Sequence, residues 1–398
     1  MPNVFAPPPS YFLLLLALLA AGASAGGTAL AAQVEGSWRS DLLANVDGGA
    51  RTGRAHVGQF DLSLGAETPG LFGTRASWRL SGFWNEGGTF ADLVGDVQVV
   101  SNIEANGRGF RINEAWLDQP LPGIDGRLLL GRYDLNGEFD VLEAALPFVN
   151  SAFGIGTDLG ASGENGPSIF PATGLGTRLE VEVTPSLRLR LAAVDGVPGQ
   201  PEGPRRQLFT VAGDEGAFLI GEFAWQGPST RVLLGRWAYT RTRDSLCAGV
   251  PGCVSGDAPE NGTYLRAERV LARSTGGGRT SAFLRLGTAS GAHDPIDRFV
   301  SAGILLEGPV TRRPADAFGA AFSGGRLSQD FRRARAVDAS SLAPREGAFE
   351  VFYRLQVTEQ LALQPLAMLV TDPGGVEDDA LVLGLRVELA GAFRPHRP

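Results

Sequence analysis

Charged and aromatic residues that could bind a ligand occur at every second position of several short segments. In the segment RINEAWLDQ, Glu114, Trp116 and Asp118 lie on one face of an extended chain, with Asn113 and Leu117 on the other. Guanidinium and carboxylate groups form paired hydrogen bonds with neighbouring hydroxyls, and an aromatic ring covers an apolar surface. These residue types therefore predict noncovalent recognition of a hydroxylated solute.

Seven further charged residues are candidates for the same role, because they lie on neighbouring alternating segments or directly follow them. They are Arg39, Asp41, Arg79, Arg132, Asp134, Glu138 and Asp140. The last three begin the longest stretch without alternation, 134–172, which also contains Glu143.

Covalent chemistry has little support in the sequence. The histidines are His56, His293 and His396, and spacing assigns none of them a serine or cysteine nucleophile. Cys247 and Cys253 enclose the segment AGVPG, which favours a disulfide in an oxidising compartment. Metal binding needs further ligands, and none lies nearby in the sequence. We therefore expect no enzyme, no metal site and no cofactor.

Composition excludes several classes of protein. The 43 acidic residues outnumber the 35 basic ones, all of which are arginine, and the formal net charge of -8 argues against a nucleic-acid partner. A mean hydropathy of +0.02 is too polar for a bundle of membrane-spanning helices, whereas 43% hydrophobic residues is too many for a disordered chain. Glycine, at 55 of 398 residues, is about twice as frequent as the usual ~7%.

The N-terminal region has the features of an export signal. Residues 11–23 read YFLLLLALLAAGA, an apolar run that matches a signal-peptide core and is too short to span a bilayer as a helix. Ala23-Ser24-Ala25 provides the small residues that a signal peptidase requires, and Ala29-Leu30-Ala31 is a second candidate. We expect a signal peptide over 1–25, with cleavage as late as 32 as the alternative.

Past the signal, polar and apolar side chains alternate almost everywhere. In RLEVEV (178–183), Arg178, Glu180 and Glu182 lie opposite three apolar residues, a pattern that indicates strands with one polar and one apolar face. Helices would instead place apolar residues three and four positions apart. The predicted strands are 36–46, 54–65, 74–85, 110–119, 126–133, 173–184, 186–195, 216–226, 230–241, 262–273, 279–288, 297–307, 315–323, 348–358, 360–371 and 379–390.

Short and long connections alternate between these segments. Thr184-Pro185-Ser186, Gly227-Pro228-Ser229, 274–278 and 358–359 are tight turns, whereas 86–109, 134–172, 196–215, 242–261 and 324–347 are long. Outer-membrane barrels sort short periplasmic turns and long outer loops in this way, and an even strand number lets an antiparallel sheet close. We therefore predict an all-β fold, a closed antiparallel transmembrane β-barrel of about 16 strands over 33–393, with a short tail at 394–398.

Several segments resemble one known family, the carbohydrate-selective porins (OprB family) of Gram-negative outer membranes. They are SNIEA (101–105), RINEAWLDQ (111–119), GRYDLNGEFDV (131–141), NSAFGIG (150–156), NGPSIFP (165–171), AAVDGVPG (192–199), YRLQVTEQLALQP (353–365) and DALVLGLRVEL (379–389). The resemblance covers nearly the whole mature chain. It implies a sixteen-stranded barrel in the outer membrane that passes small sugars such as glucose by passive diffusion.

In such a barrel the ten candidate residues would line the pore. We expect stretch 134–172 to fold back into the barrel and narrow it, because a pore of this strand number otherwise stays wide. The competing interpretation is that the charges only hydrate the lumen and pair with one another, since barrel interiors are polar whatever the solute.

The expected partners are small carbohydrates, outer-membrane lipid and the barrel-assembly machinery, with a homotrimer as an open alternative to a monomer. The rival functions are a porin for anions or other small solutes, an outer-membrane barrel enzyme such as a lipase or protease, and a soluble exported β-protein that binds carbohydrate.

Overall fold

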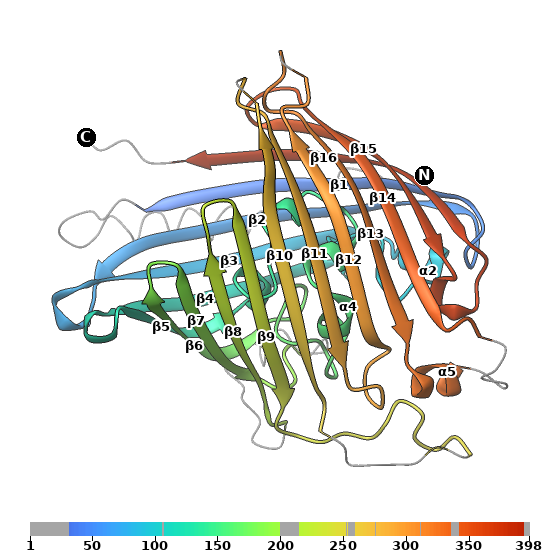
Figure 1. Ribbon diagram of the computed structural model, residues 1–398, viewed down its shortest axis with the longest axis horizontal. Coiled ribbons are helices and arrows are strands. Elements are labelled where there is room, and N and C mark those ends of the chain that lie inside the picture. The colour runs from blue at the N-terminus through green and yellow to red at the C-terminus, as the bar shows by residue number, and fades with distance from the viewer. Residues whose placement is uncertain are drawn as a thin grey trace.

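The computed structural model describes residues 32–105, 107–199, 215–251, 253, 259–274, 276–310, 312–335 and 342–393. Sixteen antiparallel strands of this part of the chain form a closed barrel, in which β1 pairs with both β2 and β16 (Figure 1). This confirms the predicted fold class. The expected signal peptide, both candidate cleavage sites and the tail 394–398 lie outside the described residues.

Each predicted strand has a counterpart in the barrel. The strands are β1 (Gln33–Asp47), β2 (Gly53–Pro69), β3 (Arg75–Gly87), β4 (Gly109–Leu121), β5 (Gly126–Tyr133), β6 (Gly174–Thr184), β7 (Leu187–Asp195), β8 (Ala217–Gln226), β9 (Thr230–Tyr239), β10 (Asn261–Arg273), β11 (Arg279–Ala289), β12 (Ile296–Glu307), β13 (Ala317–Leu327), β14 (Arg345–Gln356), β15 (Leu361–Thr371) and β16 (Ala380–Phe393). Strand β13 ends four residues later than expected, because Gly324 and Gly325 hide an alternation that resumes with Arg326 and Leu327.

Alternation along each strand separates an outer apolar face from an inner polar one. On β6 and β7, Val183 and Leu191 are 51% and 45% exposed and point outward, whereas Arg178 and Arg190 are buried and point inward. Because no water satisfies backbone groups inside a bilayer, closure of the sheet is what allows this chain to cross it. No helix of the described residues is long and apolar enough to cross a membrane.

Connections of different length lie at the two ends of the barrel. One end has only short turns: 70–74, 122–125, 185–186, 227–229, 274–278, 308–316 and 357–360. The other end has the long loops 88–108, 134–173, 196–216, 240–260 and 328–344, together with the shorter connections 48–52, 290–295 and 372–379. This is the predicted alternation, so the long-loop end is the outer one.

Short helical segments lie within the connections. They are η1 (Leu71–Gly73), α2 (Ala91–Val94), η2 (Pro122–Ile124), η3 (Leu135–Gly137), η4 (Glu143–Ala145), α3 (Ser151–Gly154), α4 (Thr157–Gly160), α5 (Gln329–Arg335) and η6 (Pro373–Gly375). Figure 1 shows α4 behind the front strands, and α4 contacts β11 and β12.

Loop 134–173, named here the inner loop, crosses the interior of the barrel. It begins at β5, yet the backbone N–H groups of Val149 and Asn150 donate to Glu350 on β14, at 2.8 and 2.9 Å. Gln364 on β15 donates to the carbonyl oxygen of Pro147 at 2.9 Å. Strands so far apart in the ring can be reached only through the interior, so the inner loop folds inward as predicted.

The inner loop also pairs with loop 88–108. The N–H of Asn102 donates to the carbonyl of Val149 at 2.8 Å, and the N–H of Ser151 donates to the carbonyl of Val99 at 3.0 Å. Together the two loops form an apolar core with the wall, in which the Phe148 ring lies 4.9 Å from the Phe352 ring of β14. The loops are therefore packed parts of the barrel interior.

Candidate functional site

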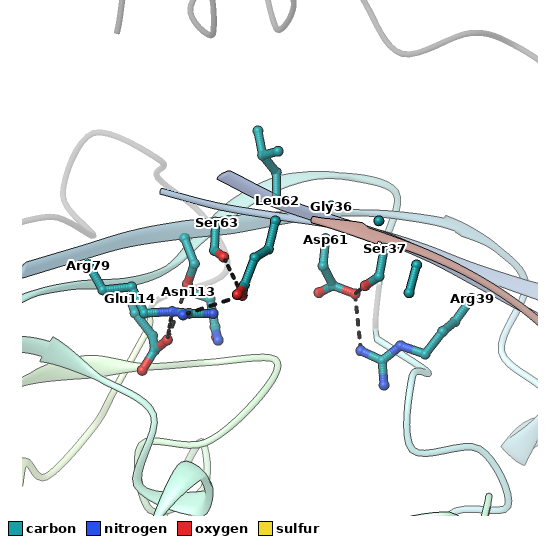
Figure 2. A pocket seen from close by; sticks show the side chains of 14 residues that line it. Gly36, Ser37, Arg39, Asp61, Leu62, Ser63, Arg79, Asn113 and Glu114 are labelled. Atoms are coloured by element: carbon teal, nitrogen blue, oxygen red, sulfur yellow. Dashed lines mark hydrogen bonds and ion pairs between the residues drawn. The ribbon is translucent and has the colours of Figure 1, made fainter. Parts of the chain in front are cut away.

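A pocket of about 520 Å³ opens on the inner wall where β1, β2, β3 and β4 lie side by side. Its charged side chains form two ion pairs, Arg39 with Asp61 at 3.0 Å and Arg79 with Glu114 at 3.1 Å. Figure 2 shows these pairs at opposite ends of the pocket. Both arginines are about one third exposed (33% and 38%), so their remaining N–H groups can reach a solute.

Trp116 extends this site along β4. Its indole Nε1 donates to Glu114 Oε1 at 3.1 Å, and its ring packs against a buried apolar cluster of the barrel interior. Cross-strand pairing of Trp116 with Arg79 and of Asp118 with Ser77 places Glu114, Trp116 and Asp118 on the inner face together. The inner wall therefore combines an aromatic ring with a guanidinium–carboxylate pair, as the sequence predicted.

Asn113 departs from the predicted alternation. A bulge in the pairing of β3 with β4 inserts one residue at this point, and Asn113 lines the pocket beside Glu114. Its side chain donates to Asp134 at 3.4 Å. A bulge disrupts the ladder locally and redirects side chains, which alternation along the sequence does not reveal.

Asp134 directly follows β5 and contacts Asn113 at the edge of the β1–β4 pocket. Burial, together with the nearby Glu114 carboxylate, raises the pKa of Asp134 to about 7. Its Oδ1 accepts a hydrogen bond of 3.0 Å from the N–H of Asn136. The charge near the Arg79–Glu114 pair therefore changes around neutral pH.

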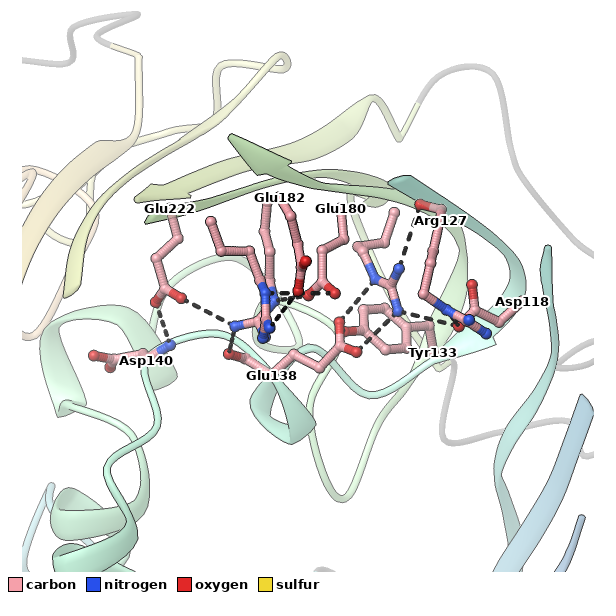
Figure 3. A network of polar contacts seen from close by, with 11 residues as sticks. Asp118, Arg127, Tyr133, Glu138, Asp140, Glu180, Glu182 and Glu222 are labelled. Carbon is pink, nitrogen blue, oxygen red and sulfur yellow. Dashed lines mark hydrogen bonds and ion pairs between the residues drawn. The ribbon is translucent and has the colours of Figure 1, made fainter. Parts of the chain in front are cut away.

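A second polar network attaches the start of the inner loop to β4–β8 (Figure 3). Glu138 accepts two hydrogen bonds from Arg178, at 2.8 and 2.9 Å, and a third from the Tyr133 hydroxyl. Arg178 also lies 3.7 Å from Asp118, which pairs with Arg127 at 2.8 Å. Two of the candidate residues, Asp118 and Glu138, thus share one arginine.

Asp140 lies at the centre of a fully buried cluster. Arg285 on β11 donates to Asp140 at 3.0 Å and to Asp158 of α4, and Arg266 on β10 lies 3.4 Å from Asp140. The N–H of Asp140 donates to Glu222 of β8 at 3.0 Å. All five side chains of this cluster have zero exposure. Asp140 therefore holds the inner loop to the wall and is inaccessible to a solute.

Besides Asp140, the candidate residues Asp41, Asp118 and Arg132 are also buried. Asp41 pairs with Arg386 of β16, at 2.7 Å to each oxygen, and accepts a 2.6 Å hydrogen bond from Ser101 of loop 88–108. Arg132 donates to Thr173 at the end of the inner loop. The structure therefore places Asp41, Arg132 and Asp140 in contacts that fix loops, whereas Arg39, Arg79 and Glu114 line the open pocket.

Sequence reasoning missed the wall residues that hold the loops. Arg178 and Arg190 were visible on the polar face of alternating segments, but nothing marked them as loop contacts. Arg285, Arg386 and Glu350 stand alone among apolar neighbours, and their partners lie 127 to 345 residues away in the chain. Only a three-dimensional arrangement could assign them.

Two remaining predictions concern cysteine and histidine. Cys247 and Cys253 form a disulfide within outer loop 240–260. The sequence assigned no serine partner to a histidine, yet the Nε2 atom of His56 lies 2.8 Å from the Ser40 hydroxyl oxygen. Ser40 is only 3% exposed, so this contact is a hydrogen bond between β1 and β2 that substrate cannot reach.

Comparison with known proteins identifies the family. The model of the carbohydrate-selective porin, OprB family, matches residues 51–390. This chain belongs to that family. The porin is 24% identical over 392 aligned residues to Porin B of Pseudomonas aeruginosa, covering 87% of this chain and 85% of that protein.

Solved structures show the same fold. The porin superposes on the high-pH structure of Pseudomonas putida OprB with a TM-score of 0.78 and 19% identity, over 91% of this chain and 94% of the other. The outer membrane channel DcaP of Acinetobacter baumannii gives a TM-score of 0.57 at 11% identity, over 90% and 97%. The chain is thus a carbohydrate-selective porin of the outer membrane, a channel and not an enzyme.

Proposed function

We propose that this porin passes monosaccharides of the size of glucose, and that the β1–β4 pocket binds them in transit. The observation that carries the proposal is the pair of accessible ion pairs, Arg39–Asp61 and Arg79–Glu114, on one wall beside Trp116. Each pair leaves donors and acceptors free for vicinal hydroxyls, and the indole ring offers an apolar surface to a sugar ring.

A sugar that passes the pocket exchanges its hydrogen bonds to water for weak hydrogen bonds to the wall. A sugar hydroxyl accepts from a guanidinium N–H of Arg79 and donates to a carboxylate oxygen of Glu114, and each bond replaces one to water. Partly exposed groups that also bind water hold a sugar weakly, which suits a channel because a solute must also leave. The packed inner loop narrows the path and forces a sugar close to this wall.

We further propose that the porin reaches the membrane through the barrel-assembly machinery and assembles there as a homotrimer. The outer face of β1–β3 supports an interface between copies. Cross-strand pairing places His56 and Glu86 on this outward face among apolar residues. Polar groups that face lipid are costly, and a neighbouring barrel would cover them.

Conductance in planar bilayers tests the sugar proposal. Glucose is expected to reduce the ionic current, and R79A or E114A is expected to weaken this block about five- to tenfold, or about 1–1.5 kcal/mol. The matched control is R279A. Arg279 faces inward and pairs with Glu307 of the neighbouring strand, and both lie on the wall opposite the β1–β4 pocket. Block by gluconate or chloride without block by glucose would instead identify an anion channel.

The control variant also decides between binding and hydration of the lumen. If R279A weakens glucose block as much as R79A does, lumen charges act only through general hydration, and the β1–β4 pocket has no special role. Cross-linking of native membranes tests the trimer, and a monomer as the largest species would contradict it.

A further inference from the structure

Three arginines face each other on the outer surface of the barrel wall. Arg298 of β12 pairs in register with Arg326 of β13, and Arg326 pairs with Arg345 of β14. All three side chains are exposed. Directly opposed residues of neighbouring antiparallel strands have Cβ atoms about 4.5–5.5 Å apart, and like charges at that distance repel.

The side chains of this arginine row point away from the lumen. Phe322 and Phe349 share the strand faces of Arg326 and Arg345 and are 47% and 46% exposed. The intervening residues point inward and are buried, as Ser323 and Glu346 illustrate. The arginine row therefore borders the surface that contacts lipid.

The height of the arginine row coincides with the outer rim of the membrane. Strand β12 begins at Ile296, β13 ends at Leu327 and β14 begins at Arg345, all at the end with the long loops. Phe322 and Phe349, which oppose each other four residues nearer the barrel centre, lie in the apolar band below. This order, cations above aromatic rings, matches a lipid with an anionic headgroup above acyl chains.

Counter-ions among the described residues neutralise only part of this charge. Arg326 donates twice to Asp297, at 2.6 and 2.7 Å. Within the described part of the chain, no ion pair involves Arg298 or Arg345, which flank that pair. Among the residues that the structure describes, the row thus keeps two cations without a counter-ion, on a protein whose formal net charge is -8.

We propose that the arginine row binds phosphate groups on the headgroup of an outer-leaflet lipid. A planar guanidinium forms paired hydrogen bonds with phosphate oxygens, and two flanking cations suit a headgroup that carries more than one phosphate. The bound phosphate also removes the repulsion between the opposed arginines. The acyl chains of the same lipid then lie over the apolar face of β12–β14, which are neighbours in Figure 1.

The test uses lipid A with two phosphates, added to the purified porin in detergent and quantified by native mass spectrometry. R298A/R345A is expected to bind this lipid at least about tenfold more weakly, the loss that corresponds to about 1.4 kcal/mol. Lipid A stripped of both phosphates is expected to bind the native porin as weakly as it binds the variant. Equal binding of both lipids, or by both proteins, would overturn the proposal.

The matched control is R236A/R269A, which removes two exposed, outward-facing arginines without arginine neighbours. Arg236 pairs with Gly221 and Thr263, and Arg269 pairs with Thr230 and Ala282. This variant is expected to bind lipid A within twofold of the native porin, and a loss equal to that of R298A/R345A would reduce the effect to overall charge.

Two further arms keep the result interpretable. R298Q/R345Q retains the length of the side chains, so it replaces the alanine variant if that barrel does not assemble, and the same loss is expected. Inorganic phosphate at the same concentration as lipid A is not expected to displace the bound lipid, because the acyl chains add affinity that a free phosphate lacks. Displacement would assign the site to free phosphate and contradict a lipid site.

Discussion

Replacing Arg285 with methionine is expected to free the inner loop from the barrel wall. The guanidinium of Arg285 is fully buried and pairs with two fully buried carboxylates, Asp140 and Asp158, both on the inner loop. Methionine has a comparable length but no charge, so the substitution leaves two buried carboxylates without this partner.

The magnitude follows from the burial of the cluster. Removing one partner of a buried ion pair costs about 3–5 kcal/mol, because the remaining charge is desolvated without compensation. A factor of ten corresponds to about 1.4 kcal/mol, so conformations with a detached inner loop become roughly two to four powers of ten more populated. Contacts of this loop with Glu350 and Gln364 remain, and the barrel itself is expected to assemble.

Single-channel conductance and limited proteolysis measure this effect. R285M is expected to show larger or fluctuating conductance and faster cleavage within 134–173. The control is R279M, on the same strand and inner face, whose partner Glu307 is 37% exposed. Exposed pairs contribute about 0–1 kcal/mol, so R279M is expected to behave like the native porin.

A compensating variant completes the test. R285M/D158N removes the carboxylate that has no other arginine and leaves Asp140 beside Arg266, 3.4 Å away, so it is expected to restore much of the protection of the inner loop. If R285M and R279M give the same conductance and cleavage rate as the native porin, Arg285 does not hold the inner loop and the reasoning is refuted.

Three further predictions follow from single residues. Because the pKa of Asp134 is raised to about 7, lowering the pH from 8 to 6 removes one negative charge, and cation preference measured by reversal potential is expected to fall. E350A leaves the buried N–H groups of Val149 and Asn150 without their acceptor, and we expect a loss of about 1–3 kcal/mol for each in denaturant unfolding of the assembled barrel. C253S opens a short disulfide loop, so faster cleavage of 240–260 with unchanged conductance is expected.

Each of these predictions has its own control. D134N is expected to abolish the pH shift, and a shift that persists would assign it to another group. The folded pKa of Asp134 lies above the ordinary value of about 3.9, so this group makes the free energy of unfolding rise as the pH falls from about 8 to about 4. The control for E350A is E359A, which removes an exposed carboxylate of a short turn and is expected to leave the stability of the barrel unaltered. For C253S, a loss of conductance would contradict a purely local role of the disulfide.

Strand positions and faces could be predicted because they depend on local geometry. Side chains of a strand alternate between two faces, so Arg178 and Glu114 were assigned to the polar face without knowledge of the fold. Alternation fails where the backbone departs from regular geometry, at the bulge that turns Asn113 toward the pocket. It also fails where glycines carry no side chain to show a face, as at Gly324 and Gly325.

The sequence by itself determined the class of protein: an exported, closed barrel of about sixteen strands with a polar interior, one short-turn end and one long-loop end. Only the tertiary structure decided which interior charges remain accessible. Arg79 and Glu114 remain accessible to a solute. Asp41 and Asp140 are instead buried beneath loops, where they form ion pairs with Arg386 and Arg285. The physical reason is that side-chain alternation follows from the local backbone geometry of a strand. An ion pair between wall and loop depends instead on the folded position of a long loop.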